Sequence, residues 1–386
     1  MEQESPENNM KKQLIFVIVL IFSFLITSCG NSLPNNLEPL KAYENCEIKT
    51  LSEDYVCVWA DEFNGSELDM TKWNIEVNGY GGGNQELQYY KEDNIFVRDG
   101  KLEIEGRKEY FSGKSYTSGR INSKYKGDFR YGRVEFSAKV PTGNGTWSAV
   151  WLLPTMNSYG GWPNSGEIDI LEHVGYDPNR VFSSTHTKKF NHLGDKGSLT
   201  FSKTLYEATT DFNNYVFEWE PGNMKMYVNE SKIGEFNYVP AYNQDVEYKD
   251  VYPFDQMFHI IINLAIGGVW GGVQGINDEI FPTSMYVDYV RVYQKNIAHI
   301  DKTAPSKPEK IRKMTSLSRS IFWNPSEDDV MVEKYAVYVD GDFYKYTNLN
   351  QIRFNSLFPG EYEITIEAID FTGRVSSKSD KFILLI

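Results

Sequence analysis

The chain has 386 residues, a formal net charge of −14 and an aromatic content of 15%. The acidic balance argues against nucleic acid and against a strongly anionic polymer as the main ligand, because phosphates and other anions need a basic face. A neutral ligand is compatible with this charge. The aromatic content fits β-structure and also sugar-binding clefts, in which flat rings stack on pyranose faces, and the length indicates about two domains.

The first 29 residues have the organisation of an export signal. Lys11 and Lys12 precede an apolar run over 14–26, which is shorter than a typical membrane span and fits the apolar region of a signal peptide. The run ends in Leu25-Ile26-Thr27-Ser28-Cys29-Gly30, which resembles the lipobox of bacterial lipoproteins. This predicts lipidation at Cys29 and a lipid-anchored protein of the bacterial cell envelope, either periplasmic or on the cell surface. An ordinary secretory signal with a chance cysteine is the alternative.

Residues 30–54 lack periodicity and indicate a tether between the membrane and the first domain. Export implies an oxidising compartment, so Cys46 and Cys57 can form a local disulfide, although the sequence does not show whether they are bonded. Neither cysteine lies near a histidine in the sequence, which gives a thiol nucleophile or a zinc site little support.

The region 55–296 alternates short strands with turn signals and lacks long helical periodicity. This pattern predicts an all-β domain built as a two-sheet sandwich, whose curved sheets offer a concave face to a chain-like ligand. The clearest predicted strands cover 94–97, 101–104, 132–140, 215–219, 225–229, 258–264 and 285–293.

One strand of this domain carries three carboxylates within six positions, Glu167, Asp169 and Glu172. In a strand, Glu167 and Asp169 point to one face. The alternation breaks at Ile170-Leu171, where a one-residue β-bulge would return Glu172 to the same face. Like charges on one face repel, so folding alone would not favour them, whereas close acidic groups divide into acid and base roles. The alternative is a solvated acidic strand.

Residues 297–308 indicate a linker, and residues 309–386 a second, smaller β-unit. Trp323 and the runs 335–339 and 362–366 mark strands in this unit. The segment 357–362 resembles the tyrosine corner of immunoglobulin-like sandwiches, so the unit resembles a fibronectin type III domain. It contains no catalytic constellation, and a spacer or stabilising role is favoured over glycan binding.

Six blocks of the first domain, taken in order, resemble the family-16 glycoside hydrolases. No single block is specific, but their order is. The resemblance implies a β-jelly-roll sandwich with an open cleft and retaining hydrolysis of internal β-glycosidic bonds. The blocks are 59–63, 118–121, 145–154, 167–172, 263–268 and 285–293.

Carried over by position, Glu167 resembles the nucleophile, Asp169 the assisting carboxylate and Glu172 the acid/base. Retaining hydrolysis needs two carboxyl groups about 5–5.5 Å apart, one attacking the anomeric carbon while the other protonates the leaving oxygen. Asp169 would hydrogen-bond Glu167, and its charge would help to keep a proton on Glu172. This chemistry requires no cofactor.

The bulged form of the motif, with the upstream block 84–90, resembles laminarinases, which cut β-1,3-glucans, although agarases and carrageenases share it. The resemblance therefore implies an endo-β-1,3-glucanase acting on a neutral β-glucan. Mixed-linkage glucan, a galactan and a non-catalytic glycan-binding lipoprotein are the alternatives. The candidate substrate contacts are Asn84, Arg120, Trp147, Trp151, Trp162 and His186.

Four of these six residues, the three tryptophans and His186, have structural alternatives to a role in substrate binding. Each tryptophan can instead pack in the core. His186 would face the cleft if its strand neighbours the catalytic strand, whereas His173, next to Glu172, is expected to face the other way and pack.

Many members of this family carry a structural calcium on the side away from the cleft. Asp288 lies at the matching position, with the Gly100 carbonyl and the Glu62 region as further ligands, and oxygen ligands suit calcium. We expect a monomer that meets the membrane only through its lipid.

Overall fold

The computed structural model describes residues 42–52, 55–238, 247–295, 302–313, 315–328, 332–370 and 372–386. The predicted signal peptide with Cys29 and the first part of the predicted linker lie outside these residues. Within the described ranges, no helix is long and apolar enough to cross a membrane.

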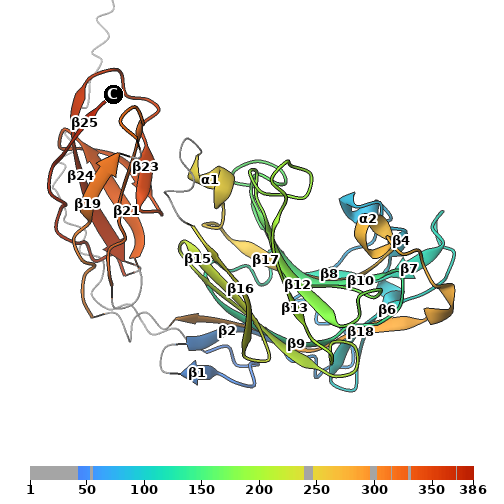
Figure 1. The fold of residues 1–386 in the computed structure, drawn as a ribbon. Helices are drawn as coiled ribbons and strands as arrows, with labels where there is room; N and C mark the ends of the chain where they lie inside the picture. The colour runs from blue at the N-terminus through green and yellow to red at the C-terminus, as the bar shows by residue number, and fades with distance from the viewer. Residues whose placement is uncertain are drawn as a thin grey trace, which may run out of the picture. The chain divides into compact units, whose positions relative to one another are not determined.

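The first domain is a sandwich of two antiparallel sheets (Figure 1). The nine-stranded sheet has the order β1-β2-β18-β9-β14-β15-β16, and β6, with β5 beside it, also pairs with β18. Its strands are β1 (Thr50–Ser52), β2 (Tyr55–Asp61), β5 (Ile95–Arg98), β6 (Lys101–Gly106), β9 (Gly132–Lys139), β14 (Asn213–Glu220), β15 (Asn223–Val228), β16 (Ser231–Asn237) and β18 (Thr283–Lys295).

The seven-stranded sheet has the order β13-β12-β11-β10-β17-β8-β3, with the acidic strand β11 near its middle. Its strands are β3 (Asn74–Ile75), β8 (Arg120–Asn122), β10 (Thr146–Pro154), β11 (Glu167–Val174), β12 (Arg180–His186), β13 (Leu199–Thr204) and β17 (Phe258–Ile266). A separate parallel pair joins β4 (Gln88–Tyr90) to β7 (Tyr116–Ser118).

Helical structure in the described residues is confined to single turns. The α-helical turns are α1 (Tyr248–Val251) and α2 (Gly268–Gly271), and 3₁₀ turns cover Gly81–Gly83, Glu92–Asn94 and Asp278–Ile280. All seven strands predicted from the sequence are present, with ends within two residues of the prediction. The two-sheet sandwich is therefore the architecture that the alternation of short strands predicted.

The hydrophobic core lies between the two sheets, and strand alternation explains how it forms. In β9, Val134, Phe136 and Ala138 are fully buried in the core, while the alternate residues Arg133 and Glu135 lie on the other face and form an ion pair. Each large apolar side chain buried in this way contributes about 1.5–3 kcal/mol to the free energy of folding.

The N-terminal edge of the domain differs from the predicted tether. Cys46 and Cys57 are disulfide-bonded, the Tyr43 backbone N–H donates to the Cys57 carbonyl (2.8 Å), and β1 pairs with β2. The folded domain therefore begins N-terminal of the predicted boundary at Tyr55. The sequence did not show whether the two cysteines are bonded. Their disulfide closes a short loop that holds this edge in place.

The C-terminal β-unit has its own two sheets, β19-β20-β23 and β22-β21-β24-β25, and its own core around Trp323 and Tyr335. The Tyr362 hydroxyl donates to the Phe358 carbonyl (3.0 Å), which is the backward hydrogen bond of a tyrosine corner. The strands are β19 (Glu309–Lys313), β20 (Ser320–Asn324), β21 (Val332–Val339), β22 (Asp342–Thr347), β23 (Gln351–Arg353), β24 (Glu361–Asp370) and β25 (Phe382–Leu385).

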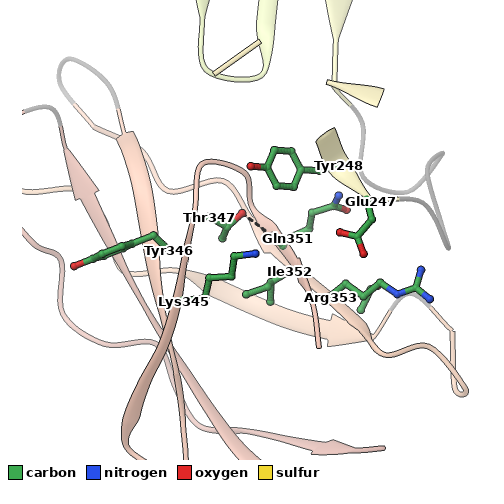
Figure 2. A pocket seen from close by; sticks show the side chains of 9 residues that line it. Glu247, Tyr248, Lys345, Tyr346, Thr347, Gln351, Ile352 and Arg353 are labelled. Atoms are coloured by element: carbon green, nitrogen blue, oxygen red, sulfur yellow. Dashed lines mark hydrogen bonds between the residues drawn. The ribbon is translucent and has the colours of Figure 1, made fainter. Parts of the chain in front are cut away.

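Figure 2 shows a small pocket to which β22 and β23 contribute, with the Thr347 hydroxyl donating to the Gln351 carbonyl (3.0 Å). Glu247 and Tyr248 also line it. Its volume is about 30 Å³, which is the space of a single water molecule and too small for a sugar ring.

Candidate active site

The predicted bulge is present in β11. Against β10, Leu171 pairs with Val150 and Asp169 pairs with Trp151, so Ile170 is the extra residue. The register against β12 shifts at the same place. Ile170 and Leu171 are both buried in the core, because the bulge turns two successive apolar side chains inward. The following residue, Glu172, consequently returns to the face that carries Glu167 and Asp169.

Glu167 and Asp169 lie at the end of β11 beside His186. The register pairs Glu167 with His186 on β12, and His186 Nε2 lies 3.2 Å from Asp169 Oδ2. The Trp162 indole N–H donates to Glu167 Oε2 at 2.5 Å. This hydrogen bond favours the ionised form of Glu167, which is the form a nucleophile needs.

Glu172 is held by donors from both neighbouring strands. The Trp147 indole N–H on β10 donates to Glu172 Oε1 (3.2 Å), and the Ser184 hydroxyl on β12 donates to Oε2 (3.4 Å). Trp147 in turn packs edge-on against Trp270, with ring centroids 5.5 Å apart. Ser184 carries no sequence signal of its own, since it becomes a partner only through the pairing of β12 with β11.

Burial and mutual repulsion raise the pKa values of all three carboxyl groups. Burial, together with the charge of Asp169, raises the pKa of Glu167 from 4.5 to about 8. Burial raises the pKa of Glu172 from 4.5 to about 7, and the charge of Glu167 adds to the rise. Burial and the charge of Glu172 also hold the pKa of Asp169 well above 3.8. Near neutral pH the group therefore shares protons, so one member can be an acid while another is ionised.

A cleft of about 530 Å³ opens beside Glu167. It adjoins a second pocket of about 300 Å³ that shares Glu76, Arg120 and Trp162 and continues toward Lys124 and His259. Because the two pockets share these residues, they form one continuous hollow beside the seven-stranded sheet.

The structure separates the predicted substrate contacts into two groups. Asn84, Arg120, Trp151 and Trp162 line the cleft. Trp147 and His186 instead contact the carboxyl groups, so their direct effect is on the acids. Trp162 is 39% exposed, which leaves its ring open to a sugar face.

Several lining residues carry no motif that would single them out. Glu76 pairs with Arg120 (3.0 Å), and the His192 ring lies 5.2 Å from the Trp162 ring. Both come from loops or short edge strands, so only the folded chain brings them to the cleft. Asn78, Tyr80 and Leu193 also line the cleft.

His173 packs, as expected from its position after Glu172. It is fully buried, and its Nε2 atom lies 3.2 Å from the Pro178 carbonyl oxygen. Burial lowers the pKa of His173 to about 4, so this ring is neutral at physiological pH.

The predicted calcium ligands meet at one junction of the nine-stranded sheet. Along β18, Val287 pairs with Leu102 of β6, and Val290 pairs with Asp61 of β2. Asp288 therefore lies where the start of β6, after Gly100, meets the end of β2, before Glu62.

The side chain of Glu62 does not fit the calcium role. Both of its oxygens accept from Arg291, at 2.8 and 2.7 Å. A cation site here would therefore use Asp288 with backbone oxygens. In the cleft, single donor atoms of Glu167, Asp169 and His186 lie within 4.8 Å of one another, which is also close enough to attract a divalent cation.

The comparison with known families decides how this cleft is classified. Residues 83–291 match the model of glycosyl hydrolases family 16. The chain belongs to this family. It is therefore a glycoside hydrolase, and the acidic strand β11 lies inside the matched region.

The relatives of this family-16 hydrolase include glucan-cleaving enzymes. The chain is 44% identical over 245 residues to the beta-glucanase of Rhodothermus marinus, covering 61% of this chain and 84% of that protein. It is 38% identical over 293 residues to glucan endo-1,3-beta-glucosidase A1 of Niallia circulans, covering 70% of this chain and 42% of that longer protein. The solved laminarinase of Rhodothermus marinus has a TM-score of 0.60 and 44% identity, covering 62% of this chain and 98% of that one.

Proposed function

We propose that this family-16 hydrolase is a retaining endo-β-1,3-glucanase that cuts internal bonds of laminarin-type polysaccharides. The observation that carries the proposal is the bulge in β11, which brings Glu167, Asp169 and Glu172 to one face beside the cleft. The glucan-cleaving relatives support β-1,3-glucan as the substrate. An open hollow is suited to attack within a chain rather than at its end.

In the proposed mechanism, Glu167 attacks the anomeric carbon while Glu172 gives its proton to the departing glycosidic oxygen. A glycosyl ester forms on Glu167, and the part of the polysaccharide that carried the departing oxygen leaves. Glu172 then takes a proton from water, the water attacks the same carbon, and Glu167 is released with net retention. Before the reaction, the negative charge of Glu167 helps to keep the proton on Glu172. Glu172 gives up this proton when the glycosidic bond is cleaved.

Neighbouring groups prepare these steps. The Trp162 N–H stabilises the ionised nucleophile, and the Trp147 and Ser184 donors hold Glu172 in one orientation. Asp169 lies beside His186, and the negative charge of Glu167 favours the protonated form of Glu172. Arg120 and the exposed Trp162 ring supply hydroxyl and stacking contacts to the sugar chain.

A polysaccharide panel tests the proposal. Purified protein is incubated with laminarin, mixed-linkage β-glucan, agarose and carrageenan, and the products are sized over time. We expect laminarin to be cut fastest, to short oligomers rather than to glucose alone, with β-anomers appearing first in proton NMR. Faster cleavage of agarose would assign the enzyme to galactans, and an initial α-anomer would contradict retention.

We also infer that residues 1–29 are a lipoprotein signal and that Cys29 anchors the enzyme to the cell envelope. The support is the charged, apolar and lipobox-like order of the sequence. Growth with a labelled fatty acid should label the wild-type protein and leave a Cys29→Ser variant unlabelled. Equal labelling of both would refute the anchor.

The C-terminal unit is proposed to be a fibronectin type III-like spacer. Its two small sheets, separate core and tyrosine-corner hydrogen bond support this assignment. Tight binding of laminarin by this unit would instead make it a glycan-binding module.

A further inference from the structure

A buried hydrogen-bond chain runs from the cleft surface to a carboxylate that the mechanism above does not use. The Trp151 indole N–H donates to Asn263 Oδ1 (2.8 Å), and Asn263 Nδ2 donates to the Tyr90 hydroxyl (3.2 Å). The Tyr90 hydroxyl donates to Glu86 Oε2 (3.0 Å), which also accepts from Gln88 Nε2 (2.6 Å). Glu86, Tyr90 and Asn263 are each at most 5% exposed.

The direction of every bond in this chain follows from the groups at its two ends. An indole N–H can only donate, so the Asn263 amide must turn its oxygen toward Trp151. The amide nitrogen then faces Tyr90 and donates, which leaves the phenol proton to point at Glu86. Glu86 Oε2 accepts from both Tyr90 and Gln88, so this carboxyl group terminates the hydrogen-bond chain, and the four groups have a single arrangement.

The chain joins parts of the molecule that are far apart in sequence. Tyr90 lies on β4, Asn263 on β17 and Trp151 on β10. In the sheet, Asn263 pairs with Ala149, two residues before Trp151, and with Arg120 on its other side. The Arg120 guanidinium lies 4.9 Å from the Trp151 ring and 6.0 Å from the Tyr90 ring. The indole of Trp151 is thus fixed at its N–H and along its ring.

Glu86 also supports the glycine turn at the rim of the cleft. A Cβ atom on Gly82 would lie 2.1 Å from Glu86 Oε1, so the turn packs directly on the carboxylate. Gly82, with φ +59°, and Gly83 both line the cleft, followed by Asn84. The buried side chain of Glu86 therefore contacts the glycine turn directly and is linked to the Trp151 ring through Tyr90 and Asn263.

We propose that Glu86 is a positioning residue for substrate binding, which acts through Tyr90 and Asn263 to hold the Trp151 ring and directly to hold the turn at Gly82. The proposal rests on the proposed function, because it assigns Trp151 to the grip on the sugar chain. It predicts that interrupting the chain of hydrogen bonds weakens substrate binding and leaves the proton transfers of Glu172 unchanged.

The test compares two Tyr→Phe substitutions. Tyr90→Phe removes the hydroxyl that links Asn263 to Glu86. Tyr215→Phe is the matched control, because its fully buried hydroxyl lies on β14 of the other sheet and has no hydrogen-bond partner among the described residues. On the polysaccharide that the wild-type protein cuts, Tyr90→Phe should raise KM about 5–20-fold with kcat within about threefold and an unshifted pH profile. Tyr215→Phe should stay within about twofold in both constants.

A double-mutant cycle then asks whether the effect passes through Trp151. Trp151→Phe removes the first donor, so adding Tyr90→Phe to it should raise KM less than twofold further. If Tyr90→Phe does not fold, Glu86→Gln and Glu86→Leu replace it. Gln keeps an acceptor and should remain near wild type, whereas Leu should raise KM at least about tenfold.

Three results would overturn the positioning role. They are an unchanged KM in the folded Tyr90→Phe protein, additive effects of Tyr90→Phe and Trp151→Phe, and a shifted pH profile of kcat. A wild-type protein that cuts none of the polysaccharides would count against the proposed function, whereas the three results above are differences between variants of an active enzyme.

Discussion

The two sheets of the sandwich both bury carboxylates, but they treat the charge differently. In the nine-stranded sheet, Glu62 is paired with Arg291, and Glu135 with Arg133. In the seven-stranded sheet, His186 is the one ion-pair partner that the described residues supply to Glu167, Asp169 and Glu172.

The difference appears in the pKa values. Burial alone would raise the pKa of Glu103 in the nine-stranded sheet, but hydrogen bonds from Arg98 and Ser284 outweigh it and lower that pKa. Among the described residues, no guanidinium pairs with Glu167 or Glu172 to oppose burial, and the pKa values of these two groups rise to about 8 and about 7. One sheet therefore uses buried acids for stability, and the other keeps them in an unfavourable state that suits catalysis.

The largest expected effect is on activity and separates the two sets of acids. Glu167→Gln should lower kcat on laminarin by at least about 10³-fold, because the amide cannot form the glycosyl ester. Glu135→Gln, in the other sheet, is the control and should leave kcat within about threefold. Circular dichroism verifies that both proteins are folded, and full activity of folded Glu167→Gln would contradict the assignment.

The second largest expected effect is on stability and concerns the ion pairs of the nine-stranded sheet. Arg291→Met leaves Glu62 buried without its cation, so the free energy of unfolding should fall by about 3–5 kcal/mol. Urea denaturation measures this loss. The kcat of the remaining folded enzyme should be unchanged, because the pair lies in the sheet that does not carry the carboxylate cleft. A decrease in the free energy of unfolding of less than about 1 kcal/mol would show that the ion pair between Glu62 and Arg291 does not stabilise the fold.

The third effect is a gain in stability at high pH when the carboxyl group of Glu172 is replaced by an amide. The pKa of Glu172 rises on folding from 4.5 to about 7, so the native state binds more protons than the unfolded chain between these values. Its contribution to stability therefore falls as pH rises through this window. At about 1.4 kcal/mol per pH unit, the full cost above pH 7 is roughly 3 kcal/mol. Glu172→Gln should remove it and be more stable than wild type at pH 8.5.

The same substitution should give little stability change near pH 4, where wild-type Glu172 is protonated in both states. Unfolding curves of the two proteins at both pH values provide the measurement. A gain of equal size at pH 4 and pH 8.5 would assign the effect to packing rather than to charge.

The smallest expected effect concerns calcium at the junction near Asp288. If backbone oxygens and Asp288 hold a calcium ion, saturation at about 100 times Kd would add about 2.7 kcal/mol. Chelation should then lower Tm by several degrees without reducing kcat at a temperature well below Tm. In Asp288→Ala, added calcium and chelator should have equal Tm values. A calcium effect that survives this substitution would place the ion elsewhere.

Much of this architecture could be predicted from local pattern. Alternation determined the strands of the sandwich, because a half-buried strand needs an apolar residue at every second position. The same rule made the break at Ile170-Leu171 visible, and the register shift between β10 and β11 confirms the bulge. Local patterning failed at the N-terminal edge, where an irregular segment is held by β1 and by the bond between Cys46 and Cys57.

The sequence by itself determined the fold class and the three acids with their common face, since both depend on spacing within one strand. The tertiary structure alone decided what surrounds them. Ser184 reaches Glu172, Trp147 serves the acid rather than the cleft, and Glu86 is linked to Trp151 only through strand pairings. The reason is physical: pairing partners in an antiparallel sheet are set by non-local register, which no short stretch of sequence specifies.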